Sequence, residues 1–173
     1  KHALSYQYNQ GVLYVYYNMI HRWGKEQFAA DAAQAGVDGV LPLDLPPEEK
    51  ADGIGGKSAI HTIRLIAPTT PEERMAKICR QGRGFIYYVS REGVTGVRDQ
   101  VAGNIPEAVA RIRACTGLPV AVGFGISSRA QVAQVAAHAD GVIVGSVLVN
   151  CIRDHLGHPG KITARLAEVT SDL

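Results

Sequence analysis

Six short apolar segments alternate along this chain with stretches in which apolar residues recur at helical spacing. The apolar segments have the length of strands and cover residues 12–17, 39–43, 62–67, 84–89, 119–122 and 141–144. Between the first two, Phe28, Ala29, Ala32 and Ala33 share one face of an expected helix. Strands that are apolar throughout are typical of parallel sheets covered by helices. The pattern therefore predicts an α/β fold built from β-α units rather than from hairpins.

Local signals mark where several helices should begin. Residues 46–49 and 70–73 both place proline and acidic side chains in an expected first turn. Ser127 and Ser128 precede a further helix. The connection 50–60 contains three glycines where a crossover helix would be expected, so we expect a short or mobile crossover there.

The length of the chain limits how these units can be arranged. At 173 residues the chain suits one globular domain. A (β/α)8 barrel typically takes about 250 residues and eight strands. Six strands therefore fit either a compact doubly wound sheet or most of a barrel that lacks its first two units.

Charge and cysteine content exclude several classes of protein. The net charge is +2, with 18 basic and 16 acidic residues spread along the sequence, so no basic stripe suggests nucleic-acid binding. No apolar stretch approaches the roughly 18 residues needed to cross a membrane. Cys79, Cys115 and Cys151 are far apart and in no C-x-x-C arrangement. Free thiols in a reducing compartment are expected, which predicts a cytoplasmic protein that can still bind small anions.

A glycine-containing segment follows each of the last three apolar segments. They are Ser-Arg-Glu-Gly-Val-Thr-Gly at 90–96, Gly-Phe-Gly-Ile at 123–126 and Gly-Ser at 145–146. Glycine lets the backbone approach a phosphate closely, and a helix that starts just beyond adds the positive end of its dipole. The three segments together predict one phosphate pocket.

The residue sequences of these segments are specific enough to indicate a protein family. The stretches 84–96 (GFIYYVSREGVTG), 119–127 (PVAVGFGIS) and 141–146 (GVIVGS) resemble the tryptophan synthase α subunit in order and spacing, and the likeness extends upstream through 16–18, 28–39, 44–49 and 65–74. It covers the chain from about residue 12 onward and leaves 1–11 unmatched, so we expect one partial TIM-barrel domain over 1–173.

The resemblance implies a fold, an activity and a partner. Its members are TIM barrels that cleave indole-3-glycerol phosphate into indole and glyceraldehyde 3-phosphate in tryptophan biosynthesis, a lyase reaction. They pass indole to a PLP-dependent β subunit. For this chain the resemblance implies no cofactor and no metal of its own. The six strands would correspond to the third to eighth strands of an incomplete barrel.

The same resemblance implies roles for individual residues. The substrate phosphate would be bound by Gly96, Gly125, Gly145 and Ser146. The rest of the substrate pocket would include Tyr87, Thr95, Phe124, Tyr16 and Asn18. Because Tyr87 and Tyr88 alternate on one strand, one should face the barrel interior and the other the helices; the resemblance favours Tyr87 for the interior.

The two catalytic carboxylates of the family have no counterpart in this sequence. The family carries a glutamate on its second strand and an aspartate in the loop that follows, and both should precede Val12 by tens of residues. Residues 1–11 contain neither Asp nor Glu. We therefore expect a chain that is incomplete at its N-terminus, contains no catalytic residue, and binds substrate with little or no turnover, since positioned acids and bases each typically supply about 10²–10⁴ in rate.

Two other interpretations remain at this point. The chain could be a non-catalytic module, derived from the same barrel, that binds phosphate or regulates a partner. It could also be another phosphate-binding TIM barrel, such as a relative of indole-glycerol-phosphate synthase, although the wording at 90–96 and 123–127 favours the α subunit. In an open barrel the first and last strands lack partners, which predicts a marginal or self-associating chain.

The remaining polar residues have plainer interpretations. Asp44 ends a strand and is expected to cap the Pro46-Pro47 turn rather than to act as a base. Arg91 and Glu92 are expected to be solvated loop charges. Cys151, His155 and His158 are spaced as on one helical face, but Gly157 and Pro159 should end that helix and a zinc site needs a fourth ligand; no metal site is predicted.

Overall fold

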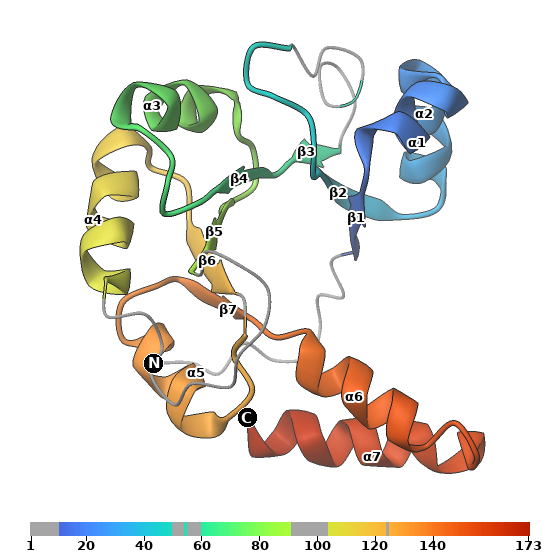
Figure 1. The fold of residues 1–173 in the computed structure, drawn as a ribbon. Helices are drawn as coiled ribbons and strands as arrows, with labels where there is room; N and C mark the ends of the chain where they lie inside the picture. The colour runs from blue at the N-terminus through green and yellow to red at the C-terminus, as the bar shows by residue number, and fades with distance from the viewer. Residues whose placement is uncertain (1–10, 50–53, 55–59, 91–103, 124) are drawn as a thin grey trace.

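Parallel strands and helices alternate along the chain (Figure 1). The computed structural model describes residues 11–49, 54, 60–90, 104–123 and 125–173. Its elements are β1 (Gly11–Val15), α1 (Tyr17–Trp23), α2 (Lys25–Gln34), β2 (Val37–Pro42), β3 (His61–Thr62), β4 (Arg64–Ile66), α3 (Glu72–Gln81), β5 (Ile86–Val89), α4 (Ile105–Cys115), β6 (Val120–Gly123), α5 (Arg129–Ala136), β7 (Gly141–Ile143), α6 (Ser146–Asp154) and α7 (Pro159–Asp172). The predicted α/β class is confirmed.

Every strand pairing in the described residues is parallel, in the orders β1-β2-β3 and β4-β5-β6-β7. The third expected strand, 62–67, is divided at Ile63 into β3 and β4. The backbone N–H of Ile63 still donates to the carbonyl of Val40 at 2.8 Å. Ile63 therefore joins the sheet that ends with β3 to the sheet that begins with β4. Ile63 marks the point where pairing changes from β2 to β5.

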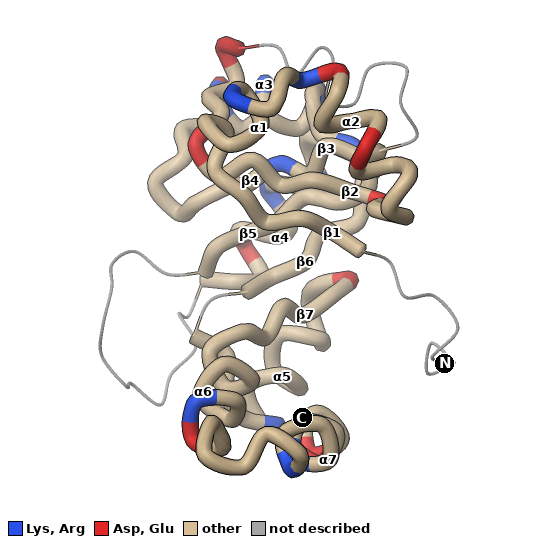
Figure 2. The backbone as a smooth tube through the Cα atoms, turned by 90° about the vertical axis from the view of Figure 1, so that its right-hand side faces the viewer, with Lys and Arg blue, Asp and Glu red and all other residues tan. Residues whose placement is uncertain are grey.

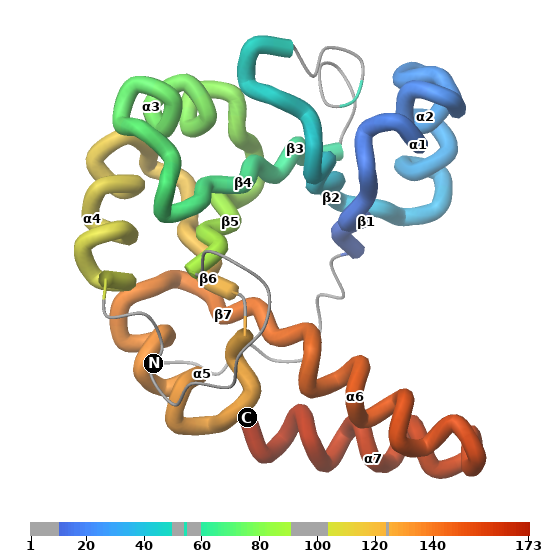
Figure 3. Tube along the Cα trace, in the orientation of Figure 1, coloured from blue at the N-terminus to red at the C-terminus, as the bar shows by residue number. Residues whose placement is uncertain are grey.

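The strands follow one another around a curve that does not close. Within the described residues, β1 pairs only with β2 and β7 only with β6. Figure 3 shows these two strands at opposite ends of the curved path. This is the open arrangement expected for a partial barrel.

The helices cover the outer side of the strands. Around β4 to β7, the helices α3, α4 and α5 contribute to a cluster that includes Ile66, Ile78, Ile86, Ile112 and Val122. A second cluster joins α1 and α2 to β1 and β2. Basic and acidic positions are interspersed over the chain rather than gathered into a stripe (Figure 2).

The inner side of the strands carries a separate apolar cluster. Leu41, Ile63 and Tyr87 form its buried centre, while Phe85 and Ile143 pack against it. The next residue along β5, Tyr88, packs instead with the outer cluster. The predicted alternation of the two tyrosines is therefore confirmed, with Tyr87 on the inner wall.

Most predicted strand ends lie within two residues of those observed, but two segments have a different kind of structure from the one predicted. The first strand ends at Val15, and α1 begins at Tyr17, because the backbone N–H of Tyr17 is bound by a carboxylate and so starts a helix. Residues 47–49 form a turn rather than the first turn of a helix, and Glu49 N–H donates to the carbonyl of Pro46 at 3.1 Å. The glycine-rich connection that follows lies mostly outside the described residues.

The helix start at Ser128 is confirmed in detail. The Ser128 side chain accepts a hydrogen bond from the backbone of Gln131, and the Gln131 side chain accepts one from the backbone of Ser128. This reciprocal pair is a capping box. Among the helices that the structure describes, none is both long and apolar enough to cross a membrane.

Candidate functional site

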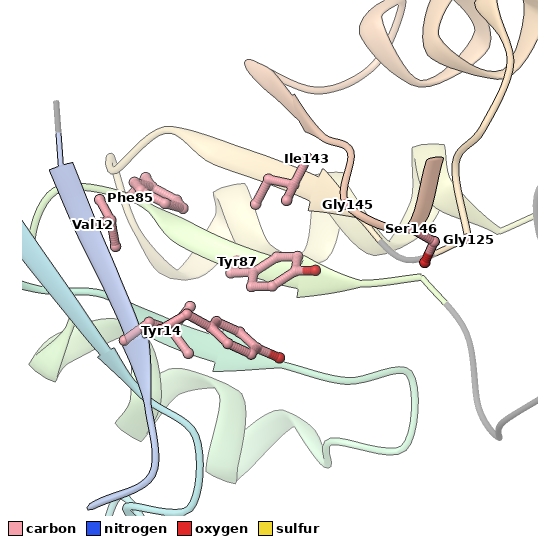
Figure 4. Close-up of a pocket in the computed structure, with 9 residues that line it drawn as sticks. Val12, Tyr14, Phe85, Tyr87, Gly125, Ile143, Gly145 and Ser146 are labelled. Carbon is pink, nitrogen blue, oxygen red and sulfur yellow. The ribbon is translucent and has the colours of Figure 1, made fainter. Parts of the chain in front are cut away.

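A cavity of about 440 Å³ lies against the inner wall of the sheet. Figure 4 shows the residues that line it, which come from β1, β2, β5 and the residue before it, β7, the loops after β6 and β7, and the start of α6. The lining residues are Val12, Tyr14, Leu41, Phe85, Tyr87, Gly125, Ile143, Gly145 and Ser146. Its volume falls within the usual range of small-molecule sites.

The two ends of this cavity differ in chemistry. Val12 and Phe85 lie near one end in Figure 4, whereas Gly125, Gly145 and Ser146 lie at the other, beyond the carboxyl ends of the strands. Such a cavity can hold a ligand that has an apolar body and a polar or anionic end.

The polar end has the features of an anion site. Helix α6 begins at Ser146, and Gly145 precedes it without a side-chain cap. The first N–H groups of a helix have no acceptor within the helix and carry its positive dipole end, so they favour an anion. Gly125 has a φ of +71°, a left-handed conformation that glycine adopts without strain. Backbone groups from two loops therefore meet at this end.

A missing side chain on β6 makes room for Tyr87. A Cβ at Gly123 would lie 2.8 Å from the Tyr87 hydroxyl oxygen and 2.8 Å from the Ile143 Cβ. Ser90 fixes the same region, because its N–H and its hydroxyl both donate to the Gly123 carbonyl, at 3.0 and 3.1 Å. The position of the Tyr87 ring thus depends on glycine at 123.

Two tyrosines face the middle of the cavity. Tyr14 comes from β1 and Tyr87 from β5 (Figure 4). Burial raises the pKa of Tyr87, and the neighbouring Tyr14 raises it further. Burial, followed by the effect of Tyr16, also raises the pKa of Tyr14. Both phenols are therefore protonated at neutral pH and can donate a hydrogen bond to a ligand.

The structure brings together four of the nine residues named from the sequence. Tyr87, Gly125, Gly145 and Ser146 line the cavity. Tyr16 and Asn18 do not: Tyr16 precedes α1, Asn18 lies within it, and both are exposed. The other three, Thr95, Gly96 and Phe124, lie outside the described residues, as do Arg91 and Glu92.

Sequence reasoning missed the apolar side of the cavity. Tyr14 and Leu41 are register partners in adjacent strands, and Phe85 precedes Tyr87 by two residues. Alternate residues of a strand face the same side, so the two-residue spacing of Phe85 and Tyr87 was the available signal. The pairing of Tyr14 with Leu41 required the strand register, which the sequence does not contain.

The other polar residues considered from the sequence do not belong to this cavity. Asp44 accepts a hydrogen bond from the Tyr17 N–H, which corrects the expectation that it caps the Pro46-Pro47 turn. Helix α6 ends at Asp154, and His155 Nδ1 lies 2.8 Å from the Cys151 carbonyl oxygen. No cluster of metal-binding side chains occurs in the part of the chain that the structure describes. Burial raises the pKa of the Cys79 thiol to about 11, which leaves it unreactive.

The parallel strands neighbour one another in chain order, whereas a doubly wound sheet changes direction from its first strand. Together with a cavity beyond the carboxyl ends of the strands, this order is that of the TIM-barrel class. The comparisons with known proteins narrow this class. The family model described as tryptophan synthase alpha chain matches residues 10–173. The chain therefore belongs to the tryptophan synthase α-chain family.

Individual relatives support this assignment. The tryptophan synthase alpha chain of Opitutus terrae is 59% identical over 165 residues, which cover 94% of this chain and 62% of the relative. That of Geobacter sulfurreducens is 54% identical over 140 residues, 80% of this chain and 53% of the relative. A solved mutant α subunit from Pyrococcus furiosus superimposes with a TM-score of 0.79 at 37% identity, covering 94% of this chain and 65% of that one. The chain thus spans less than two thirds of the length of these relatives.

Proposed function

We propose that this chain forms the substrate-binding part of an indole-3-glycerol-phosphate lyase, the activity implied by its family, in tryptophan biosynthesis. The observation that carries the proposal is the meeting of Tyr87 with Gly125, Gly145 and Ser146 around one cavity. The glycine end suits the phosphate of the substrate, and the apolar end suits an indole ring. Gly96, Thr95 and Phe124 are assigned to the same site by resemblance alone.

The proposal assigns binding, and not proton transfer, to the residues of this chain. Carbon–carbon cleavage of this substrate needs a proton donor at the indole carbon and a base for the glycerol hydroxyl, roles that carboxylates fill in the family. None of the lining residues that the structure describes carries a carboxylate. We expect the 173-residue chain to bind the substrate and to produce little or no indole.

A titration with indole-3-glycerol phosphate tests the proposal. Ser146→Glu would place a carboxylate at the phosphate end and should weaken binding at least tenfold. Ser171→Glu makes the same change at an exposed position on α7 and should leave binding unchanged. Equal binding by the wild type and Ser146→Glu would contradict the phosphate assignment.

Indole release in the same samples tests the second part of the proposal. A rate near that of an intact α chain would show that proton-transfer groups are present and would contradict the binding-only role. Binding of phosphate but not of indole-3-glycerol phosphate would favour the non-catalytic phosphate-binding module instead.

A tryptophan synthase β subunit is the proposed partner. Large apolar side chains lie exposed on and just before α1, the helix that follows the carboxyl end of β1: Tyr16 at 59%, Met19 at 59% and Trp23 at 61%. Exposed apolar residues grouped in this way favour a contact surface. Size-exclusion chromatography with a purified β subunit checks this, and Trp23→Lys should weaken co-elution while Lys161→Ala, on α7, should not. Unchanged co-elution of Trp23→Lys would assign the contact to another surface.

A further inference from the structure

A second cavity, of about 340 Å³, lies between the loop after β2 and helix α3. The described lining residues of the two cavities are all different. Its walls are mostly apolar, formed in part by Leu43, Leu45 and Ile78. Two arginines, Arg64 and Arg74, line it as well. A guanidinium group among apolar walls loses its hydration, so it is expected to have a charged or polar partner.

Arg64 is buried and incompletely bonded. Arg64 is 5% exposed, and its Nη1 donates a hydrogen bond to the Leu45 carbonyl oxygen at 3.3 Å. Among the residues that the structure describes, no group forms a hydrogen bond with its buried Nε and Nη2 atoms. Burial lowers the pKa of the Arg64 guanidinium, although arginine remains charged at neutral pH. A buried charge without a counter-charge is strongly unfavourable.

The two unpartnered atoms form one edge of the guanidinium. The Nε–H and one Nη2–H point in parallel, and together they match the two oxygens of a carboxylate or the edge of a phosphate. The Nη1 bond to Leu45 holds the opposite side of the group against the β2 loop. The donor pair is thus positioned before any ligand arrives.

The other charged groups of the cavity leave this edge available. Arg74 pairs with Glu48 at 3.3 Å, near the surface, where both side chains are about half exposed. Asp44 directs its Oδ1 to the backbone of Tyr17. Thr70 accepts a hydrogen bond from Ala67 N–H. None of these bonds involves Nε or Nη2 of Arg64.

We propose that this second cavity is a binding site for a small oxyanion, a carboxylate or phosphate group held by the Nε and Nη2 edge of Arg64. Arg74 lines the same cavity and adds positive charge. The apolar walls favour a ligand in which the oxyanion is attached to a short carbon body. Because the β2 loop also carries Asp44, an occupied site would fix the loop that caps α1.

Nuclear magnetic resonance of the arginine Nε–H groups tests this site directly in the wild-type chain. Arg64→Met identifies the Arg64 signal by its disappearance. Sodium phosphate and sodium acetate are added in separate titrations, against sodium chloride of the same ionic strength. A saturable shift of the Arg64 signal with either anion is expected, and the arm that gives it tells phosphate from carboxylate. No shift beyond that of chloride up to about 50 mM, where a site of millimolar affinity would be nearly full, overturns the proposal.

Thermal unfolding gives a second readout. The measurement is made in the Ser146→Glu background, so that phosphate at the glycine end of the first cavity does not contribute. The effective anion should raise Tm in this background and in its Arg80→Met derivative, which changes an exposed arginine of α3. Arg64→Met should abolish the increase. An equal increase with Arg64→Met would place the anion elsewhere and overturn the proposal.

Discussion

Asp44 Oδ1 accepts a hydrogen bond from the backbone N–H of Tyr17 at 2.5 Å. A carboxylate that follows β2 therefore caps the helix that follows β1. This bond replaces the local side-chain cap that α1 lacks. It also fixes Tyr17, the first residue of α1, two residues beyond the end of β1, the strand that carries Tyr14.

Removal of the Asp44 carboxylate should destabilise the chain. Loss of one capping hydrogen bond typically costs about 1 kcal/mol, so Asp44→Ala should lower the free energy of unfolding by that amount. Asp44→Asn retains an acceptor oxygen and should lose less. Urea unfolding followed by circular dichroism gives the comparison. The exposed Glu26→Ala serves as control, and an Asp44→Ala loss no larger than that of the control would contradict the capping role.

Gly123→Ala should disturb the centre of the first cavity. Its Cβ would meet the Tyr87 ring and the Ile143 side chain at less than 3.0 Å. Overpacking of this kind typically costs about 1–3 kcal/mol. Gly117→Ala is the matched control, because nothing lies within 4 Å of a Cβ there. Equal stability of the two variants in urea unfolding would show that Tyr87 can move away at no cost.

The repeated apolar runs were sufficient to predict most of the alternation of strands and helices, since the central strands β2, β4, β5 and β6 are largely buried between an inner wall and outer helices. The glycine-containing segments after two of the strands were sufficient to predict that Gly125, Gly145 and Ser146 line one pocket. Ile63 shows what local patterns do not contain. The sequence places it inside one continuous strand, yet the residues before it pair with β2 and those after it pair with β5.

Long-range pairing explains the other differences. Asp44 reads as a cap for its own turn, and only the side-by-side position of β1 and β2 brings it to Tyr17. The buried Arg64 reads as an ordinary charged residue in a strand. Its burial depends on the β2 loop and α3 together, which no sequence window contains.

The tyrosines of the cavity predict a pH dependence at the alkaline end. An unfolded tyrosine ionises near pH 10, whereas burial raises the pKa of Tyr87 and Tyr14 in the folded chain. Above pH 10 the unfolded state therefore binds fewer protons, and stability should fall as the pH rises. Urea unfolding between about pH 9 and 11 measures the slope. Tyr87→Phe should show a smaller slope; an unchanged slope would rule out Tyr87 as a source.

The edge of β1 predicts self-association. Val12 is 39% exposed and Tyr14 is 59% exposed, and in the described residues β1 pairs with β2 alone. An exposed strand edge with apolar side chains favours pairing with another chain. Sedimentation velocity should show a dimer or larger species that grows with concentration. Val12→Lys should shift the distribution toward monomer, while Lys161→Ala should not; a monomer at all concentrations would disprove this prediction.

Asp140 connects three elements at the start of β7. Its Oδ2 accepts a hydrogen bond from Val120 N–H at 2.8 Å, and its Oδ1 accepts one from Arg113 Nη2 at 2.9 Å. The bond from the Val120 backbone, followed by the effects of Arg113, lowers the pKa of Asp140. Its stabilising contribution should therefore be complete above the ordinary aspartate range near pH 4 and should decline as the pH falls through the lower folded value.

Asp140→Asn should reduce the free energy of unfolding at pH 7 by about 1 kcal/mol, the usual net value of a hydrogen bond. The amide keeps one acceptor but loses the charge that attracts Arg113. Because protonation removes the same charge from the wild type, the two proteins should converge in stability at about pH 2–3, below the ordinary aspartate pKa. Urea unfolding at both pH values gives the comparison, with the exposed Asp172→Asn on α7 as control. A difference between wild type and Asp140→Asn that stays constant with pH would mean that packing, and not charge, is the origin of the effect.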